Sequence, residues 1–176
     1  VLSESVRVAG DEINDSIATY LKKVHNLVVG ERTAEEIKIK IGSAFPCNDF
    51  DLKSIDVRGL HLLSGLPRSI NLKAGDLREA MSEPLNKIVD AVKRTLERTP
   101  PELAADIVDR GIMLAGGGAL VRGISDLLSH ETGIFTHVAE DPLLCVVNGC
   151  GLVLEDFKSM RRVLDTPDFA RNVIRD

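Results

Sequence analysis

The stretch 111-GIMLAGGGALVRGISDLL-128 places three consecutive glycines between a short apolar run and a helix-like pattern. Glycine in ordered structure costs roughly 0.5–1 kcal/mol relative to alanine, so a run of three needs a physical reason. Strand, glycine loop and helix in this order are typical of a nucleotide site, because a backbone without Cβ atoms can approach a phosphate or ribose and a helix start favours negative charge. The run is neither a P-loop nor a GxGxxG motif. A tight turn with close helix–strand packing is the alternative.

A second pattern of interest lies in the first quarter of the chain. Thr33 and Glu36 have the spacing of a capping box, which predicts a helix over 33–41 that Gly42 ends. The polar face of this helix carries Glu35 and Lys38, which could hold a ribose hydroxyl and a purine. An ordinary exposed ion pair between the two is the alternative.

The spacing of apolar residues predicts the remaining elements. The 3.6-residue period predicts a helix over 11–28 and a long helix from Asp76 to about 96, in which Pro84 should produce a bend. Alternation predicts two half-buried strands near 55–58 and 70–73. The second half should contain a helix capped by Thr99, a buried strand, a helix, a strand and a helix; the last four span 112–114, 119–130, 134–138 and 142–157.

Composition limits the classes of function. The chain has 176 residues, of which 44% are hydrophobic, with a net charge of −5, enough for one substantial domain or two small ones. The acidic balance argues against a nucleic-acid partner, and no apolar run is long enough to span a membrane. The three cysteines form no CxxC and the four histidines have no metal-ligand spacing, so neither a metal site nor a catalytic triad is expected. Because the chain begins without Met and in mid-pattern, we expect a fragment.

Five ordered motifs resemble the MreB family of bacterial actin homologues, which are rod-shape-determining proteins. The resemblance runs from about residue 5 to 160, and its motifs are RVAGDE at 7–12, GERTAEEIK at 30–38, SGLPR at 64–68, TPPEL at 99–103 and RGIMLAGGGAL at 110–120.

The resemblance implies an α/β, actin-like ATPase fold of the ribonuclease H-like type, of which this chain would be only the second lobe. Residues 1–10 and 75–157 would form subdomain IIA, with residues 1–10 supplying a strand. Residues 11–74 would form IIB, an inserted α+β subdomain, and 158–176 would return to the first lobe. The implied nucleotide-contacting residues come from the capping-box helix and the glycine run: Ala34, Glu35, Glu36, Ile37, Lys38, Gly116, Gly117, Gly118 and Ala119.

The implied cofactor is ATP, with Mg²⁺ in the full-length protein but no Mg²⁺ ligand in this chain. Full-length members of the family are slow ATPases, and the hairpins that bind the phosphates would lie outside this sequence. Phosphoryl transfer depends on charge neutralisation at the γ-phosphate. We therefore expect no catalytic residue here, no measurable ATPase, and weak or no nucleotide binding by the chain alone.

The implied function is a cytoskeletal filament that directs cell shape and cell-wall elongation. Its partners would be further copies of itself and cell-elongation membrane proteins. Its location would be cytoplasmic, at the inner face of the bacterial membrane, with membrane contact through the first lobe. The loops at 59–68 and 43–51 are candidate subunit contacts; ordinary solvent-exposed loops are the alternative. The alternative function is a fragment of a metabolic kinase or chaperone-type ATPase of the same superfamily.

Overall fold

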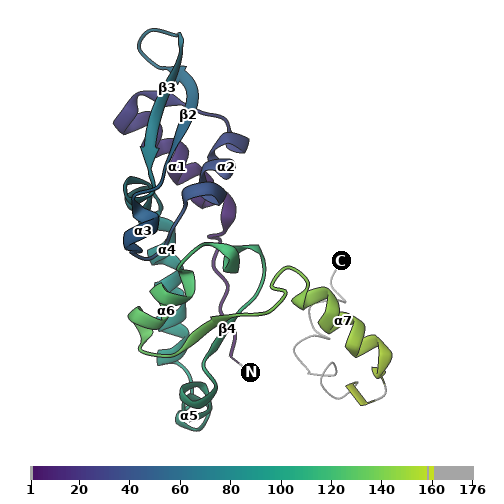
Figure 1. Ribbon diagram of the computed structural model, residues 1–176. Helices are drawn as coiled ribbons and strands as arrows, with labels where there is room; N and C mark the ends of the chain where they lie inside the picture. The colour runs from purple at the N-terminus through teal and green to yellow at the C-terminus, as the bar shows by residue number, and fades with distance from the viewer. Residues whose placement is uncertain (1, 158, 161–176) are drawn as a thin grey trace, which may run out of the picture.

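The computed structural model describes residues 2–157 and 159–160, so the expected segment 158–176 lies outside the described residues apart from 159 and 160. Two small sheets lie at different levels of an elongated body, and the long helix α4 runs between them (Figure 1). The elements are α1 (Gly10–His25), β1 (Leu27–Val28), α2 (Glu31–Ile41), α3 (Asn48–Asp51), β2 (Ser54–His61), β3 (Pro67–Lys73), α4 (Ala74–Glu97), α5 (Pro101–Arg110), β4 (Ile112–Leu114), the 3-10 turn η1 (Gly117–Leu120), α6 (Ile124–Thr132), β5 (Thr136–Val138) and α7 (Cys145–Glu155).

The first sheet is antiparallel, in the order β1-β2-β3, and the two expected strands form its hairpin. The apolar face of α1 belongs to the hydrophobic core, and its residues Ile17 and Leu21 are fully buried. The expected end of the first helix at residue 28 is wrong. Asn26 adopts a left-handed conformation with φ 52° and ends α1 at His25, so that Leu27 and Val28 extend and pair with β2.

Helix α2 begins two residues earlier than the capping box predicts. Gly30 is its N-cap, which places Thr33 inside the helix, so the capping box is wrong. The buried face is the one that the 3.6-residue period predicts, with Ala34, Ile37 and Ile41 in the core. The segment expected to be a loop at 43–51 contains the short helix α3, whose Phe50 is 6% exposed.

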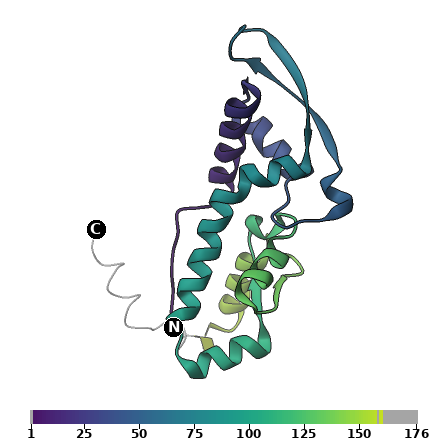
Figure 2. The same ribbon diagram turned by 90° about the vertical axis from the view of Figure 1, so that its left-hand side faces the viewer.

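Helix α4 changes direction within its N-terminal half (Figure 2), as Pro84 predicts. Proline has no amide hydrogen, so the carbonyl of Ala80, four residues earlier, has no partner within the helix. The Ser16 hydroxyl of α1 donates to that carbonyl. A contact between two helices therefore satisfies the backbone group that the proline leaves free.

The second sheet holds β4 and β5 in parallel, with α6 packed beside β5. Two expectations about it are wrong. The helix after the glycines does not start at Ala119; a 3-10 turn comes first, and α6 begins at Ile124 behind Gly123, whose φ of 72° is left-handed. Strand β4 is not fully buried, since Met113 is 65% exposed and, among the described residues, β4 pairs only with β5.

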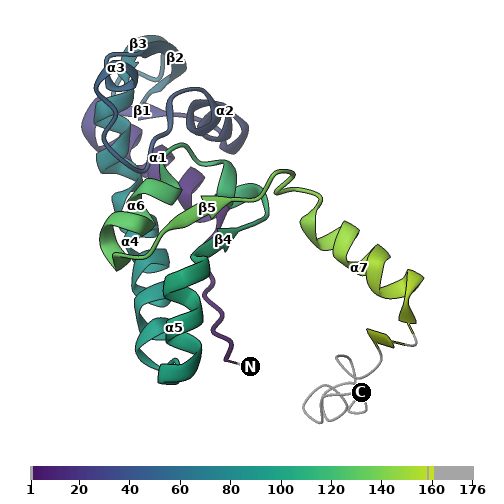
Figure 3. The ribbon, with the colours of Figure 1, turned by 60° about the horizontal axis from the view of Figure 1, so that its bottom comes forward.

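Two further helices flank the second sheet. Helix α5 begins at Pro101 with Pro100 as its N-cap, so Thr99 is not the cap; the Thr99 hydroxyl instead donates to the Thr95 carbonyl at 2.8 Å. Helix α7 extends away from the rest of the molecule (Figure 3) and has no buried residue, although it is apolar.

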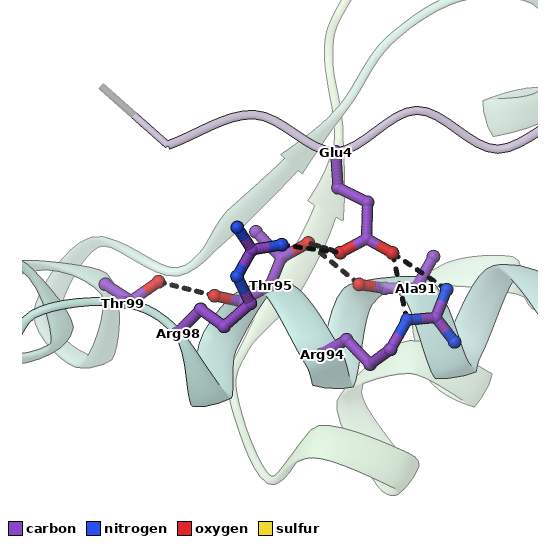
Figure 4. A network of polar contacts seen from close by, with 6 residues as sticks. All are labelled: Glu4, Ala91, Arg94, Thr95, Arg98 and Thr99. Carbon is purple, nitrogen blue, oxygen red and sulfur yellow. Dashed lines mark hydrogen bonds and ion pairs between the residues drawn. The ribbon is translucent and has the colours of Figure 1, made fainter.

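The N-terminal segment is extended but does not form the expected strand, since no partner strand lies beside residues 2–9 in the described part of the chain. It is held by side chains instead (Figure 4). Arg94 of α4 donates to Glu4 through Nε and Nη2 at 2.9 and 2.8 Å, and Arg98 lies 3.9 Å from the same carboxylate. The hydrogen bond from Arg94 is the main cause that lowers the pKa of Glu4 below its ordinary value.

Replacing Ser16 by alanine should destabilise the protein. The Ala80 carbonyl would lose its partner in a partly buried place, which costs about 1–3 kcal/mol. Ser82→Ala is the control, because the Ser82 hydroxyl is exposed and donates to Glu79 of its own helix; we expect a change within about 0.5 kcal/mol. Urea unfolding measures the free energy of unfolding of both variants. Equal losses in the two variants would show that the Ser16–Ala80 hydrogen bond does not stabilise the bent helix.

The contribution of Glu4 to stability should depend on pH. Because its folded-state pKa lies below the ordinary 4.5, the stabilisation is present above that value and is lost as the pH falls through the lowered pKa. Glu4→Gln should therefore lower the melting temperature more at about pH 7 than at about pH 3. Thermal unfolding at both pH values measures the change in melting temperature, and Glu102→Gln on α5 is the control. A loss of melting temperature that is the same at both pH values would contradict the role of Glu4.

Candidate functional site

A cavity of about 690 Å³ lies between α2, the N-terminal segment and the glycine turn. Its volume is in the range of small-molecule sites. It brings together two regions that are about 80 residues apart in the sequence. The lining residues that bear on function are Val8, Ala9, Gly10, Asp11, Glu35, Lys38, Leu85, Ile88, Gly117, Gly118, Ala119 and Arg122.

Glu35 and Lys38 both line the cavity, as the polar face of the helix predicts. They are not an ion pair in the described part of the chain. Lys38 Nζ instead donates to the Gly10 carbonyl at 3.1 Å, and both residues line the cavity. The alternative interpretation as an exposed pair therefore does not apply, and the Glu35 carboxylate has no ion-pair partner among the described residues.

Glycine occupies positions 116, 117 and 118 for different structural reasons. Gly116 has φ 84° and ψ 174°, a conformation that other residues rarely adopt, and its amide donates to Pro142 at 2.6 Å. A Cβ at Gly118 would meet nothing within 4 Å, and one at Gly117 would meet only Leu143 Cδ2 at 3.7 Å. The turn therefore requires glycine at 116 alone. At 117 and 118 the absent side chains leave open space at the cavity wall.

Four of the expected site residues do not line the cavity. Ala34 and Ile37 are 0% and 2% exposed and belong to the core. Glu36 points to another face of α2, where it pairs with Arg32 at 3.4 Å and Lys40 at 3.7 Å. Gly116 precedes the wall and sets its conformation. The cavity thus receives Glu35, Lys38, Gly117, Gly118 and Ala119 from the expected set.

Sequence reasoning missed the floor of the cavity. Residues 8–11 enter from the N-terminal segment, and the Glu12 carboxylate fixes their path by accepting from the Ala9 amide at 2.9 Å. This hydrogen bond is the main cause that lowers the pKa of Glu12. The motif RVAGDE contained the signal, because a small residue at Gly10 leaves room for Lys38 Nζ, which would lie 3.2 Å from a Cβ there.

The wall of the cavity is mostly apolar, with a few polar side chains. Apolar side chains and glycine backbone form most of the wall, while Glu35, Lys38, Asp11 and Arg122 supply separate polar groups. No cluster of metal-ligating side chains occurs among the described residues. None of the helices in the same residues is long and apolar enough to cross a lipid bilayer.

Comparison with known proteins gives a consistent result. The model of the MreB/Mbl protein family matches residues 1–162. The chain is 44% identical over 160 residues to the cell shape-determining protein Mbl of Bacillus subtilis, covering 91% of this chain and 47% of Mbl. It is 48% identical over 155 residues to the cell shape-determining protein MreB of Escherichia coli, covering 88% of this chain and 44% of MreB.

Solved structures agree with the sequence comparison. The structure of MreB5 of Spiroplasma citri bound to ADP superimposes with a TM-score of 0.86 at 34% identity, covering 94% of this chain and 49% of MreB5. The chain therefore spans about half the length of the relatives it matches. A metabolic kinase or chaperone-type ATPase, the alternative considered from the sequence, finds no support in these matches. The chain belongs to the MreB/Mbl family of bacterial actin-like, cell shape-determining cytoskeletal proteins.

Proposed function

We propose that this chain is the adenosine-binding half of an ATP-dependent, filament-forming cytoskeletal protein. The observation that carries the proposal is the position of Glu35, Lys38 and the glycine turn around one cavity. The related MreB5 has been solved with ADP and with AMPPNP, which makes an adenine nucleotide the natural ligand to test. Residues 1–10 and 75–157 would form subdomain IIA and residues 11–74 subdomain IIB.

The residues present fit the nucleoside part of ATP. The Glu35 carboxylate can accept hydrogen bonds from ribose hydroxyls, because Lys38 leaves it unpaired in the described residues. The open wall at Gly117 and Gly118 allows close approach of a flat base or a sugar. ATP, when bound, supplies the phosphoanhydride whose hydrolysis can change subunit contacts. Since the described residues offer no metal-ligand cluster, Mg²⁺ and the phosphates would depend on groups outside them.

Self-association would use the tip of the β2–β3 hairpin. Of the two candidate contact loops, 43–51 has its Phe50 buried in the core, whereas the hairpin tip exposes Leu63 at 77% and Leu66 at 65%. The tip lies at one end of the elongated body (Figure 1), which suits a head-to-tail contact between subunits. Cell-elongation membrane proteins would be further partners, and the filament would lie in the cytoplasm at the inner face of the membrane through residues outside this chain.

Titration of the ¹⁵N-labelled full-length gene product with ADP tests the nucleotide site, because the chain alone is expected to bind weakly or not at all. We expect shifts at the amides of Gly117, Gly118, Glu35 and Lys38, and none at Glu102 on α5, which does not line the cavity. Gly118→Val should weaken ADP binding by at least about tenfold, because the added side chain enters the space left for the ligand.

Gly149→Val in α7 is the matched control, since Gly149 is also surrounded by open space but does not line the cavity. It should leave the affinity for ADP unchanged. The amide of Gly118 failing to respond at millimolar ADP, or equal losses in the two variants, would overturn the assignment of the site.

Charge at the hairpin tip should prevent assembly. We expect the full-length gene product to form filaments with ATP and to pellet on centrifugation. In the double variant Leu63→Glu, Leu66→Glu the pelleted fraction should fall at least about tenfold, because burying an unpaired charge at a subunit contact is costly. Leu52→Glu is the control, as Leu52 is 81% exposed but lies away from the tip. Normal pelleting of the tip variant would exclude the hairpin from the contact.

A further inference from the structure

The cavity wall is tied directly to the segment 43–53, which connects α2 to the hairpin. Arg122 lines the cavity three residues beyond Ala119, and it forms an isolated parallel bridge with Ser43. The Ala44 amide donates to the Arg122 carbonyl at 2.7 Å. Ser43 is fully buried and its hydroxyl donates to the Phe45 carbonyl at 2.8 Å, which holds the backbone of residues 43–45 beside Arg122.

The side chain of Arg122 makes a second contact with the same segment. Its guanidinium lies over the ring of Phe50, 4.1 Å from the ring centroid. Lys53 lies at 5.0 Å from the same ring, so Phe50 is held by two cations and is only 6% exposed. Arg122 has no ion-pair partner among the described residues, which leaves the aromatic ring as its main contact.

The backbone beside Arg122 has little freedom to move independently. Gly123 is left-handed, with φ 72°, and a Cβ there would lie only 3.0 Å from Phe45 Cβ and 3.1 Å from the Phe45 amide nitrogen. Because Gly123 has no Cβ, Phe45 packs close to its backbone, and a shift of residues 119–123 toward Phe45 would press on that residue.

From Phe50 the connection continues to the root of the hairpin. Asp51 forms an ion pair with Arg78 of α4, and the Ala74 amide donates to the Lys53 carbonyl at 2.9 Å. Strand β2 then begins at Ser54. A continuous set of contacts therefore runs from the glycine turn to the base of the hairpin, whose tip is the proposed subunit contact.

We propose that Arg122 is a positioning residue for the nucleotide site, and that its contact with Phe50 couples occupancy of the cavity to the segment 43–53 and hence to the hairpin. The proposal rests on the proposed nucleotide function. A ligand held against Gly117 to Ala119 restrains the turn that carries Arg122, and the Ser43–Arg122 bridge and the Phe50 ring extend that restraint to the segment. Coupling between two sites of this kind is typically 5- to 150-fold, roughly.

Hydrogen exchange of the Ala44 amide measures the coupling, since this amide is bonded to Arg122 across the bridge. In the unaltered full-length gene product, saturating ADP should slow exchange at Ala44 by about tenfold. Arg122→Met keeps the apolar stem and removes the cation, and it should reduce the effect of ADP to less than about twofold while the Gly118 amide still responds to ADP. ADP also stabilises the whole fold by linkage, so the slowing at Ala44 is compared with that at buried amides of α4, and only the excess at Ala44 measures the coupling.

Three further variants sharpen the test. Phe50→Leu removes the ring and should have the same effect as Arg122→Met, whereas Arg122→Lys retains a cation and should keep part of the coupling. Lys53→Met is the matched control, because Lys53 is the more distant cation and does not line the cavity; it should leave the coupling intact. If Phe50→Leu proves unfolded, the two Arg122 variants still decide.

The outcomes separate the inference from the function on which it rests. A response at Gly118 without excess slowing of exchange at Ala44 in the unaltered full-length gene product overturns the coupling and leaves the nucleotide site standing. Undiminished coupling in Arg122→Met assigns it to the backbone bridge and removes the role of the side chain. The absence of any ADP response at Gly117 and Gly118 overturns both proposals together.

Discussion

The hydrogen bond from the Ser16 hydroxyl to the Ala80 carbonyl joins α1 to α4 at the place where Pro84 bends α4. Pro84 bends α4 and leaves this carbonyl without a helical partner, in a partly buried place where an unmade hydrogen bond is costly. By satisfying it, α1 is held against the bent helix. Helix α4 runs from one sheet to the other, and its bend (Figure 2) sets how the α1–α2 half faces the glycine turn. The cavity is lined by residues of both parts.

The walls of this cavity have different degrees of freedom. Helix α2 is anchored in the core by Ala34, Ile37 and Ile41, so its polar face is held rigidly. The glycine turn is short and has open space around Gly118. Its downstream end is restrained by Gly123 packed on Phe45 and by Arg122 on Phe50. A ligand would therefore meet one fixed wall and one wall that is tied to the hairpin-bearing segment.

Local rules failed where another contact, either within the same helix or from a distant segment, competed with them. Thr33 and Glu36 have capping-box spacing, yet Gly30 begins α2 earlier and Glu36 pairs with Arg32 and Lys40 instead. The pattern from Ala119 onward looks helical, but Gly123 adopts a left-handed turn that brings Arg122 beside Ser43. The apolar period of the first helix continues into Leu27, which is buried in the sheet because Asn26 reverses the chain before it.

The sequence by itself determined the hairpin, the amphipathic faces of α1, α2 and α4, the bend at Pro84, and the family resemblance through five ordered motifs. These depend on periodicity and on residues with restricted backbones, which act over a few positions. Only the tertiary structure decided that Glu35, Lys38, Gly117 and Gly118 share one cavity, that residues 8–11 form its floor, and that Arg122 contacts Phe50. The physical reason is that these contacts join segments tens of residues apart, and packing of the intervening helices, which no local pattern encodes, fixes their distances.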